Sequence, residues 1–343
     1  MALTPRKLKI LQFIIREYID TAEPVGSRTI SKNKELGISA ATIRNEMADL
    51  EELGFLSQPH TSAGRIPSQK AYRLYVDSMM ESDSLKDEQK DEIKERLEKK
   101  ITSIEELLGD ALEILSQLTN YTAIAMTPDI VKEMTIKHLQ LVPINKKSLV
   151  LVVVTDTGEV KNSAINLREE IEEEKVNIIS QMLSEKLMGH KITELDEVFI
   201  SYIKGEVSNY NRIFEDIFQV LKGNVKGEKE FNIILNGATN IFNFPEFNDI
   251  LKAQSFLKLL EQKDAIYELF NSKGIEKENV NIVIGSQEMT DIYKDCSLLT
   301  ATYLIKGKAV GKLGIIGPTR MDYSKVYSVI NYIAQTLSKI LKS

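Results

Sequence analysis

The chain of 343 residues has no tryptophan, a single cysteine and only three histidines. The lone Cys296 excludes an internal disulfide and is typical of a protein from a reducing cytoplasm. We interpret it as a small core or surface thiol rather than as a redox sensor. No run of about 18 apolar residues occurs, and no segment resembles a signal peptide. We therefore expect a cytoplasmic protein with no membrane partner.

Motifs for metal binding, phosphate binding and catalysis are also missing. The histidines are far apart, and with one cysteine no metal-site spacing is formed. The segment 307–313 resembles a phosphate loop, but it has three residues between its glycines instead of four, and Leu313 replaces the required hydroxyl. No nucleophile–base pairing can be argued from the sequence. We expect no cofactor, no metal and no enzymatic activity.

Hydrophobic residues make up 43% of the chain, which is enough for real cores and excludes a disordered chain. The length predicts two or three domains. Residues 1–75 hold 11 Lys and Arg against 8 Asp and Glu, a net charge of +3, whereas the whole chain carries −6. A mildly basic region on an acidic body would be oriented by a polyanion such as DNA without binding it indiscriminately.

The first 75 residues predict three short helices. Thr4 and Pro5 indicate the start of the first, because a hydroxyl caps free amides and proline is tolerated at the first helical position. Pro24 marks its end, since the residue before a proline avoids the helical conformation. Ser27 is expected to cap a short second helix to about residue 32, and Ser39 to cap the third.

The third predicted helix carries the chemistry. Ile43, Met47 and Leu50 fall on one side and predict packing against the first two helices. Arg44 and Asn45 fall on the opposite side among small residues. In the major groove arginine offers two donors to guanine, and asparagine pairs with adenine. The alternative is an ordinary three-helix packing unit in which both side chains are merely solvated.

A tight hairpin follows the third helix. Residues 55–57 are predicted as a strand, 60–64 as a loop tip, and Arg65 and Ile66 as the return strand, which ends at Pro67. A basic residue beside glycine at a hairpin tip suits a wing that touches phosphate or the minor groove. Three helices and such a hairpin outline a winged helix-turn-helix, which inserts one helix into the major groove.

Three segments of this region resemble a known family. They are VGSRTI at 25–30, SAATIRNEMADLEELG at 39–54 and HTSAGRIP at 60–67. They are similar to the heat-inducible transcription repressors (HrcA) of bacteria. The resemblance implies a homodimeric repressor that binds an inverted-repeat operator ahead of chaperone operons. It also implies a GAF-like central domain interrupted by an inserted dimerisation domain, and a chaperonin that keeps the repressor active.

Residues 82–100 hold seven acidic and six basic side chains, which indicates a solvated helix or linker. From 97 to 118, apolar residues alternate at spacings of four and three, as in a heptad seam. The apolar face is wider than such a seam. This favours a helix packed on a sheet of its own domain, with some face left for a partner subunit.

Strands are predicted at 136–142, 149–155 and 159–166, with 149–154 as a central strand buried on both faces. Residues 169–231 interrupt this sheet pattern and match the position of the family's dimerisation insert. They predict helices at 176–188 and 211–221 and a strand at 197–203. The remaining elements are helices across 247–270, strands at 280–285, 298–306 and 308–316, and a closing helix at 324–341. The predicted class is α+β.

We thus expect four parts: a winged-helix domain at 1–75, a charged helical linker at 76–102, a GAF-like domain at 103–168 plus 232–343, and the dimerisation insert at 169–231. The expected function is repression by a homodimer bound to double-stranded operator DNA and modulated by chaperonin. The alternative is a regulator that senses a small molecule in its GAF-like domain. The predicted DNA-binding residues are Ser27, Arg28, Thr29, Ser39, Ala41, Thr42, Arg44, Asn45, Ser62, Gly64 and Arg65.

Overall fold

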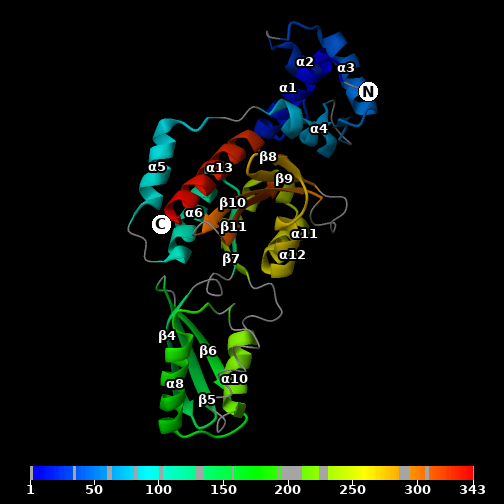
Figure 1. The fold of residues 1–343 in the computed structure, drawn as a ribbon. Helices are drawn as coiled ribbons and strands as arrows, with labels where there is room; N and C mark the ends of the chain where they lie inside the picture. The colour runs from blue at the N-terminus through cyan, green and yellow to red at the C-terminus, as the bar shows by residue number, and fades with distance from the viewer. Residues whose placement is uncertain are drawn as a thin grey trace. The chain divides into compact units, whose positions relative to one another are not determined.

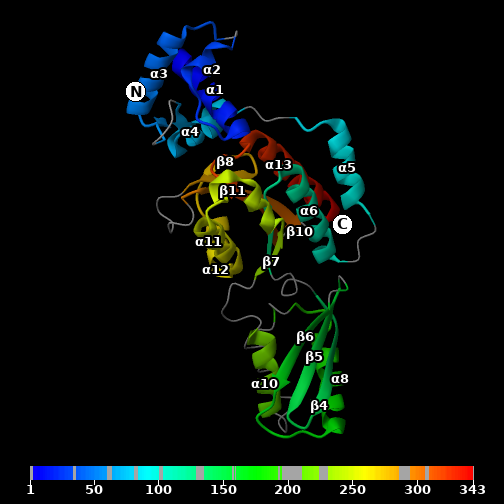
Figure 2. The same ribbon diagram turned by 180° about the vertical axis from the view of Figure 1, so that it is seen from behind.

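The structure, a computed structural model, describes residues 3–33, 36–59, 64–80, 84–99, 103–128, 135–156, 158, 160–191, 194, 211–223, 231–285, 294–305 and 309–342. They form two compact units, drawn from opposite sides in Figures 1 and 2. One unit spans Met1–Ile101, Glu105–Met126 and Ile233–Ser343, and the other spans Thr102–Ile104 and Thr127–Asn232. Helices and sheets occur in both units, which confirms the α+β class.

Residues 3–80, which we call the head, open with three helices. The elements are α1 (Pro5–Thr21), α2 (Ser27–Ser31), α3 (Ala40–Glu52), β1 (Leu56–Ser57), β2 (Ile66–Pro67), α4 (Gln69–Leu74) and the π-helical turn η1 (Tyr75–Met79). The predicted caps at Thr4 and Ser39 are confirmed, because each side chain accepts a hydrogen bond from an amide three residues on. The predicted cap at Ser27 is wrong: Ser27 is the first residue of α2, and Gly26 takes the cap position.

The head has its own hydrophobic core. Fully or nearly fully buried side chains come from α1, α2, α3 and β1: Ile10, Leu11, Ile14, Ile15, Ile30, Ile43, Met47, Leu50 and Leu56. The predicted inner side of α3 is therefore the buried side. Strands β1 and β2 pair antiparallel and are short, but the predicted end of the return strand at Ile66 is wrong, because Pro67 belongs to β2 and lies opposite Leu56.

The rest of the first unit, which we call the sheet domain, is a six-stranded sheet between helices. Its strand order is β7-β3-β11-β10-β9-β8, and both views place α6 and α13 on one side of the sheet and α11 and α12 on the other (Figures 1 and 2). The strands are β3 (Thr122–Pro128), β7 (Phe231–Asn236), β8 (Ile275–Lys277), β9 (Val280–Ile284), β10 (Cys296–Ile305) and β11 (Ala309–Pro318). The helices are α5 (Asp87–Leu97), α6 (Ile104–Thr119), α11 (Ile250–Glu261), α12 (Lys263–Phe270), α13 (Tyr323–Ile340) and the short 3-10 turns η4 (Ala238–Asn243) and η5 (Pro245–Phe247).

The expected heptad seam is divided between two helices. Helix α5 ends at Leu97 and α6 begins at Ile104, so no single helix covers 97 to 118. The wide apolar face of α6 is buried within the unit, as the favoured interpretation requires, through Leu107, Leu108, Ala111, Leu112, Ile114 and Leu115. The charged segment forms α5, which buries only Ile93 and Leu97.

The second unit has a separate three-stranded sheet. Strands β4 (Ile136–Asn145), β5 (Ser148–Thr155) and β6 (Val160–Asn166) pair antiparallel in the order β4-β5-β6. Helices α8 (Glu173–Leu187) and α10 (Asn211–Gly223) share one apolar core with this sheet. The expectation that 136–166 belong to the sheet of the C-terminal strands is therefore wrong, and the second unit begins near residue 127 rather than at 169. The strand predicted at 197–203 lies outside the described residues.

Strand β5 is central, but it is buried on one face only. Leu149, Leu151 and Val153 are buried, whereas Val150 and Val152 on the other face are half-exposed. The prediction of burial on both faces is wrong because α8 and α10 supply the core of this unit from the face of Leu149, Leu151 and Val153. Among the helices that the structure describes, none is both long enough and apolar enough to cross a membrane.

Candidate nucleic-acid interface

Helix α3 presents the predicted base-reading side chains to solvent. Its N-terminus is held by Ser39, whose Oγ accepts from Thr42 N at 3.2 Å and lies 3.0 Å from Thr42 Oγ1. Ala41, Arg44 and Asn45 are exposed, on the side opposite the buried core of the head. Arg44 and Asn45 are therefore placed where a partner surface can reach both of them.

Helix α2 lies next to α3 and adds exposed polar groups (Figure 1). Arg28 and Thr29 are exposed, whereas Ser27 is half-buried. The main-chain carbonyl oxygen of Arg28 accepts a hydrogen bond from Ser31 Oγ at 2.9 Å, which closes the short helix. The exposed groups predicted on α2 and α3 thus come from two adjacent helices of the head.

Three of the acidic side chains of α3, those of Glu46, Asp49 and Glu51, are paired with cations inside the head. Lys7 of α1 places Nζ 2.8 Å from both Glu46 Oε2 and Asp49 Oδ2. Hydrogen bonds to Asp49, and next to Glu46, raise the pKa of Lys7. Arg65 binds Glu51, with Nε 2.8 Å from Oε2. These pairs reduce the repulsion between an acidic helix and a polyanion.

Arg65 is not at an exposed loop tip. Its main chain bridges to Val25, with Val25 N to Arg65 O at 2.9 Å and Arg65 N to Val25 O at 3.0 Å. Its side chain is 21% exposed and points to Glu51. The structure thus places Arg65 at the base of the hairpin, where it ties β2 to α3, and its cation is partly neutralised.

The structure describes Gly64 but not Ser62, the other two residues predicted for the wing. Gly64 is buried against Pro24, and a Cβ atom at Gly64 would lie 2.6 Å from the carbonyl carbon and oxygen of Pro24. Only glycine allows the hairpin to approach the chain between α1 and α2 so closely. Ser62 lies outside the described residues, as do His60, Thr61 and Ala63.

The sequence reasoning missed the cations that organise this surface. Lys7 holds the acidic half of α3, and Lys70 donates from Nζ to the carbonyl oxygen of Leu53 at 2.9 Å, just past the end of the helix. Lys70 Nζ also lies 4.4 Å from the ring centroid of Phe55. Neither contact has a local signal in the sequence, because Lys70 lies 17 residues after Leu53 and Lys7 lies on a different helix from its acidic partners.

Comparison with known proteins gives the class of the molecule. The chain is 49% identical over 339 residues to the heat-inducible transcription repressor HrcA of Clostridioides difficile (strain 630), covering 99% of this chain and 100% of that protein. It is 44% identical over 342 residues to the protein of the same name from Alkaliphilus metalliredigens (strain QYMF), covering 100% and 99%. The protein is a transcription repressor.

The family follows from the same comparisons. The HrcA protein C terminal domain matches residues 105–327. The chain belongs to the HrcA family of heat-inducible transcription repressors, whose role is non-enzymatic. A crystal structure described only as that of a hypothetical protein has the same fold, with a TM-score of 0.62, 22% identity and 99% of each chain covered.

Proposed function

We propose that this repressor binds an inverted-repeat DNA operator as a homodimer, with the head acting as a winged helix-turn-helix. One observation carries the proposal: Arg44 and Asn45 are exposed on a capped helix whose opposite side, through Ile43, Met47 and Leu50, is buried in the head. A helix fixed in this way can insert its N-terminal half into the major groove without losing its own core.

The contacts divide by chemistry. Arg44 would pair with guanine and Asn45 with adenine, while Ala41 and Thr42 let the helix approach the base edges closely. The free amides after Ser39 would face a phosphate. Ser27, Arg28 and Thr29 would contact the sugar-phosphate backbone of the DNA beside that groove. The wing would contact the DNA through Ser62, Gly64 and Arg65.

Two heads are required because an inverted repeat has a two-fold axis. Recognition helices of a dimer reach successive major grooves about 34 Å apart. We assign the six-stranded sheet domain as GAF-like and the second unit as the dimerisation domain. The outer face of the second unit's sheet supports this assignment, because Val142 and Val160 are 40% and 59% exposed and Val152 is half-exposed. Exposed apolar area of this kind is typical of a subunit interface.

Modulation by chaperonin, in the cytoplasm, is part of the same proposal. Strand β3 pairs with β11, so the main sheet joins residues almost two hundred positions apart in the chain. Such non-local pairing slows folding and leaves apolar strands open to aggregation. Heat would divert chaperonin to other unfolded chains and lower the supply of active repressor. Refolding yields that were high and independent of chaperonin would contradict this step.

Gel-shift titration tests the DNA-binding proposal. The duplex is an inverted-repeat fragment from a chaperone promoter, titrated with and without chaperonin, and the control duplex has the same composition in scrambled order. We expect the affinity for the operator to exceed that for the scrambled duplex at least about 10³-fold. This is the lower end of the ratio between specific and non-specific affinity in DNA-binding proteins. Equal affinity for both duplexes would refute sequence-specific binding. An operator preference that survives Arg44→Ala and Asn45→Ala unchanged would refute the assignment of residues.

A second candidate function is favoured by one pocket. An open cavity of about 360 Å³ lies beside β9–β11 and the end of α12, lined by Asn281, Thr300, Thr302 and Lys312 among others. This polar lining fits a regulator that senses a small polar molecule. A screen of metabolites by thermal shift tests it: a saturable rise in melting temperature that Lys312→Ala abolishes would favour sensing.

A further inference from the structure

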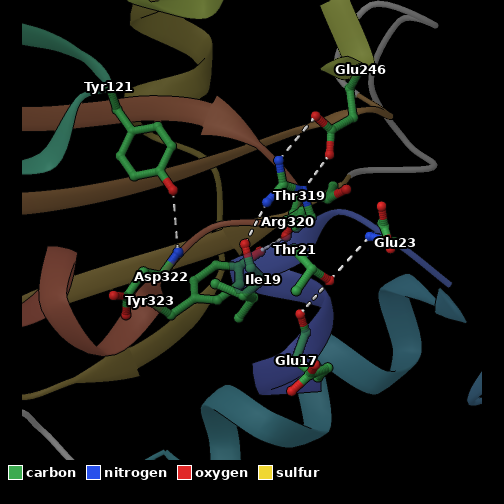
Figure 3. A network of polar contacts seen from close by, with 10 residues as sticks. All are labelled: Glu17, Ile19, Thr21, Glu23, Tyr121, Glu246, Thr319, Arg320, Asp322 and Tyr323. Carbon is green, nitrogen blue, oxygen red and sulfur yellow. Dashed lines mark hydrogen bonds and ion pairs between the residues drawn. The ribbon is translucent and has the colours of Figure 1, made fainter. Parts of the chain in front are cut away.

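One arginine of the sheet domain binds the C-terminal end of the first head helix. Arg320 donates from Nη1 to the main-chain carbonyl oxygen of Ile19 in α1, and from Nε to Glu246 Oε1 at 2.6 Å (Figure 3). Its Nη2 lies 3.4 Å from Glu246 Oε2. Arg320 is only 9% exposed. Because these partners hold three nitrogen atoms of the planar guanidinium at once, the buried side chain is restricted to one orientation.

The end of α1 is suited to receive a cation. The last four carbonyl groups of a helix lack helical partners and carry the negative end of its dipole. Here the carbonyl oxygen of Tyr18 accepts from Ala22 N at 3.0 Å, and Thr21 Oγ1 donates to Glu17 O at 2.8 Å. The carbonyl oxygen of Ile19 accepts from the sheet domain instead, so α1 is completed by a residue outside the head (Figure 3).

The segment that carries Arg320 is itself held in place. Thr319 N donates to Asp295 O at 3.0 Å, and Asp322 N donates to Tyr121 Oη at 3.3 Å. Tyr323 Oη donates to Thr319 O at 2.6 Å (Figure 3). Main-chain and side-chain bonds on both sides of Arg320 therefore fix the direction of its guanidinium.

The head also contributes an arginine to its contact with the sheet domain. Arg73 of α4 donates from Nη2 to the carbonyl oxygen of Ile284 at 3.0 Å and to that of Gly285 at 2.5 Å, at the end of β9. The rings of Tyr72 in the head and Tyr323 in the sheet domain also lie 5.9 Å apart. The two arginines, one contributed by each side, are therefore part of a wider contact between the head and the sheet domain. It also includes hydrogen bonds from Gln69 Nε2 to Lys294 O at 2.6 Å and from Lys277 Nζ to Met80 O at 3.2 Å.

Helix α1 transmits the position of Arg320 to α3. Ile19 is near one end of α1, and Lys7, which binds Glu46 and Asp49 of α3, is near the other. Twelve residues of helix span roughly 18 Å, and a helix is a rigid rod over that length. A rotation of α1 at Ile19 would therefore displace Lys7 and, through it, the acidic residues of α3 that Lys7 binds.

We propose that Arg320 is a positioning residue for operator recognition: with Glu246 it locks α1, and through α1 the recognition helix, onto the sheet domain. This inference rests on the proposed function. Buried ion pairs contribute little net stability because desolvation offsets their attraction, but they can select one geometry. In a dimer the lock would keep the two heads at the separation that the operator requires.

The first test measures the head in the full-length protein without DNA. Spin labels are attached at Lys9→Cys on α1 and Lys258→Cys on α11, both exposed positions, and labelled chains are diluted with unlabelled protein. Pulsed electron resonance then gives the distribution of distances. We expect the distribution to broaden in Arg320→Gln and in Glu246→Gln and to be restored in part by Arg320→Lys. Lys325→Gln, which removes an exposed cation nearby, is the control.

The second test separates positioning from simple loss of fold. Affinity is measured for the full inverted repeat, for one half-site, and for repeats with inserted base pairs. We expect Arg320→Gln to lower the preference for the full repeat on the order of tenfold, a part of the gain that joining two binding modules supplies. Half-site affinity should be unchanged, and tolerance of inserted base pairs should rise.

Several results would overturn the proposal. A distance distribution as narrow in Glu246→Gln as in the wild type would do so, and this variant decides the question if Arg320→Gln does not fold. An unchanged ratio of full-repeat to half-site affinity would do so as well. If the wild type bound the repeat no better than a scrambled duplex, the proposed function would fail, while the distance distributions would still decide whether Arg320 fixes the head.

Discussion

The guanidinium Nε of Arg65 donates to Glu51 Oε2 at 2.8 Å, so the hairpin of the head is fastened to the last turn of α3. The two side chains are 21% and 33% exposed, which places the pair between a surface and a buried ion pair. A residue that sequence patterns assign to a basic wing tip is thus partly used inside the protein.

Replacing Arg65 with alanine should weaken binding to all duplexes by a similar factor and make the salt dependence less steep, because one cation is lost near the phosphates. It should also destabilise the head by about 0.2–1 kcal/mol, the range for ion pairs near the surface. Urea unfolding and salt titrations of DNA affinity measure the two effects. In a Glu51→Gln background the loss of stability should be smaller, and equal losses in both backgrounds would show that the pair is not coupled.

Replacing Arg44 with alanine should have a different signature. The loss of a bidentate contact to one guanine should cost roughly 1–3 kcal/mol of operator affinity and relax the preference at one base pair. Competition gel shifts with single-base operator variants measure this. Unfolding should be unchanged, because the side chain is exposed. Wild-type discrimination at every position would contradict the proposed role of Arg44.

Two glycines should respond in opposite directions to alanine. Gly64→Ala should destabilise the protein by about 1–3 kcal/mol, since the new Cβ would lie 2.6 Å from main-chain atoms of Pro24. Gly109 lies inside α6, and nothing lies within 4 Å of a Cβ there. Gly109→Ala should therefore stabilise by up to about 1 kcal/mol through helix propensity. Thermal and urea unfolding compare the two variants, and a destabilising effect of both would contradict the packing described.

The thiol of Cys296 should not react in the folded protein. Burial, and next the charge of Asp295, raises the pKa of Cys296 to about 12 from the ordinary 9.0. A thiol-specific dye at pH 8 should label it only after unfolding. Because the thiol ionises in the unfolded chain first, its contribution to stability is complete below about pH 9 and is lost as the pH rises toward 12. Rapid labelling of the native protein would contradict the buried position.

Local signals in the sequence were sufficient to place the first three helices of the head. The caps of α1 and α3 depend on side chains next to the helix, and the inner side of α3 follows from its 3.6-residue period. The error at Ser27 is of the same local kind, because a serine one residue inside a helix looks like a cap in sequence. Burial of the predicted base-reading side chains would have excluded the proposed interface, and the structure leaves Arg44 exposed.

Contacts between residues far apart in the chain could not be predicted from the sequence. Three consecutive strands at 136–166 predict a sheet, but their pattern does not say whether that sheet continues into β11. Strand β3, which does pair with β11, was not predicted, since its alanines and threonines give little strand signal. The contact of Arg320 joins residues 301 positions apart, and no local pattern specifies such a partner.

The contact between Arg320 and Ile19 can form only late in the synthesis of each chain. Ribosomes add about 5–20 residues per second, so Ile19 is added to the chain roughly 15–60 seconds before Arg320. Throughout that interval α1 lacks the guanidinium that completes its C-terminal end. Every newly made chain therefore passes through a stage in which this contact between the head and the sheet domain is absent, and the synthesis of Arg320 determines when that stage can end.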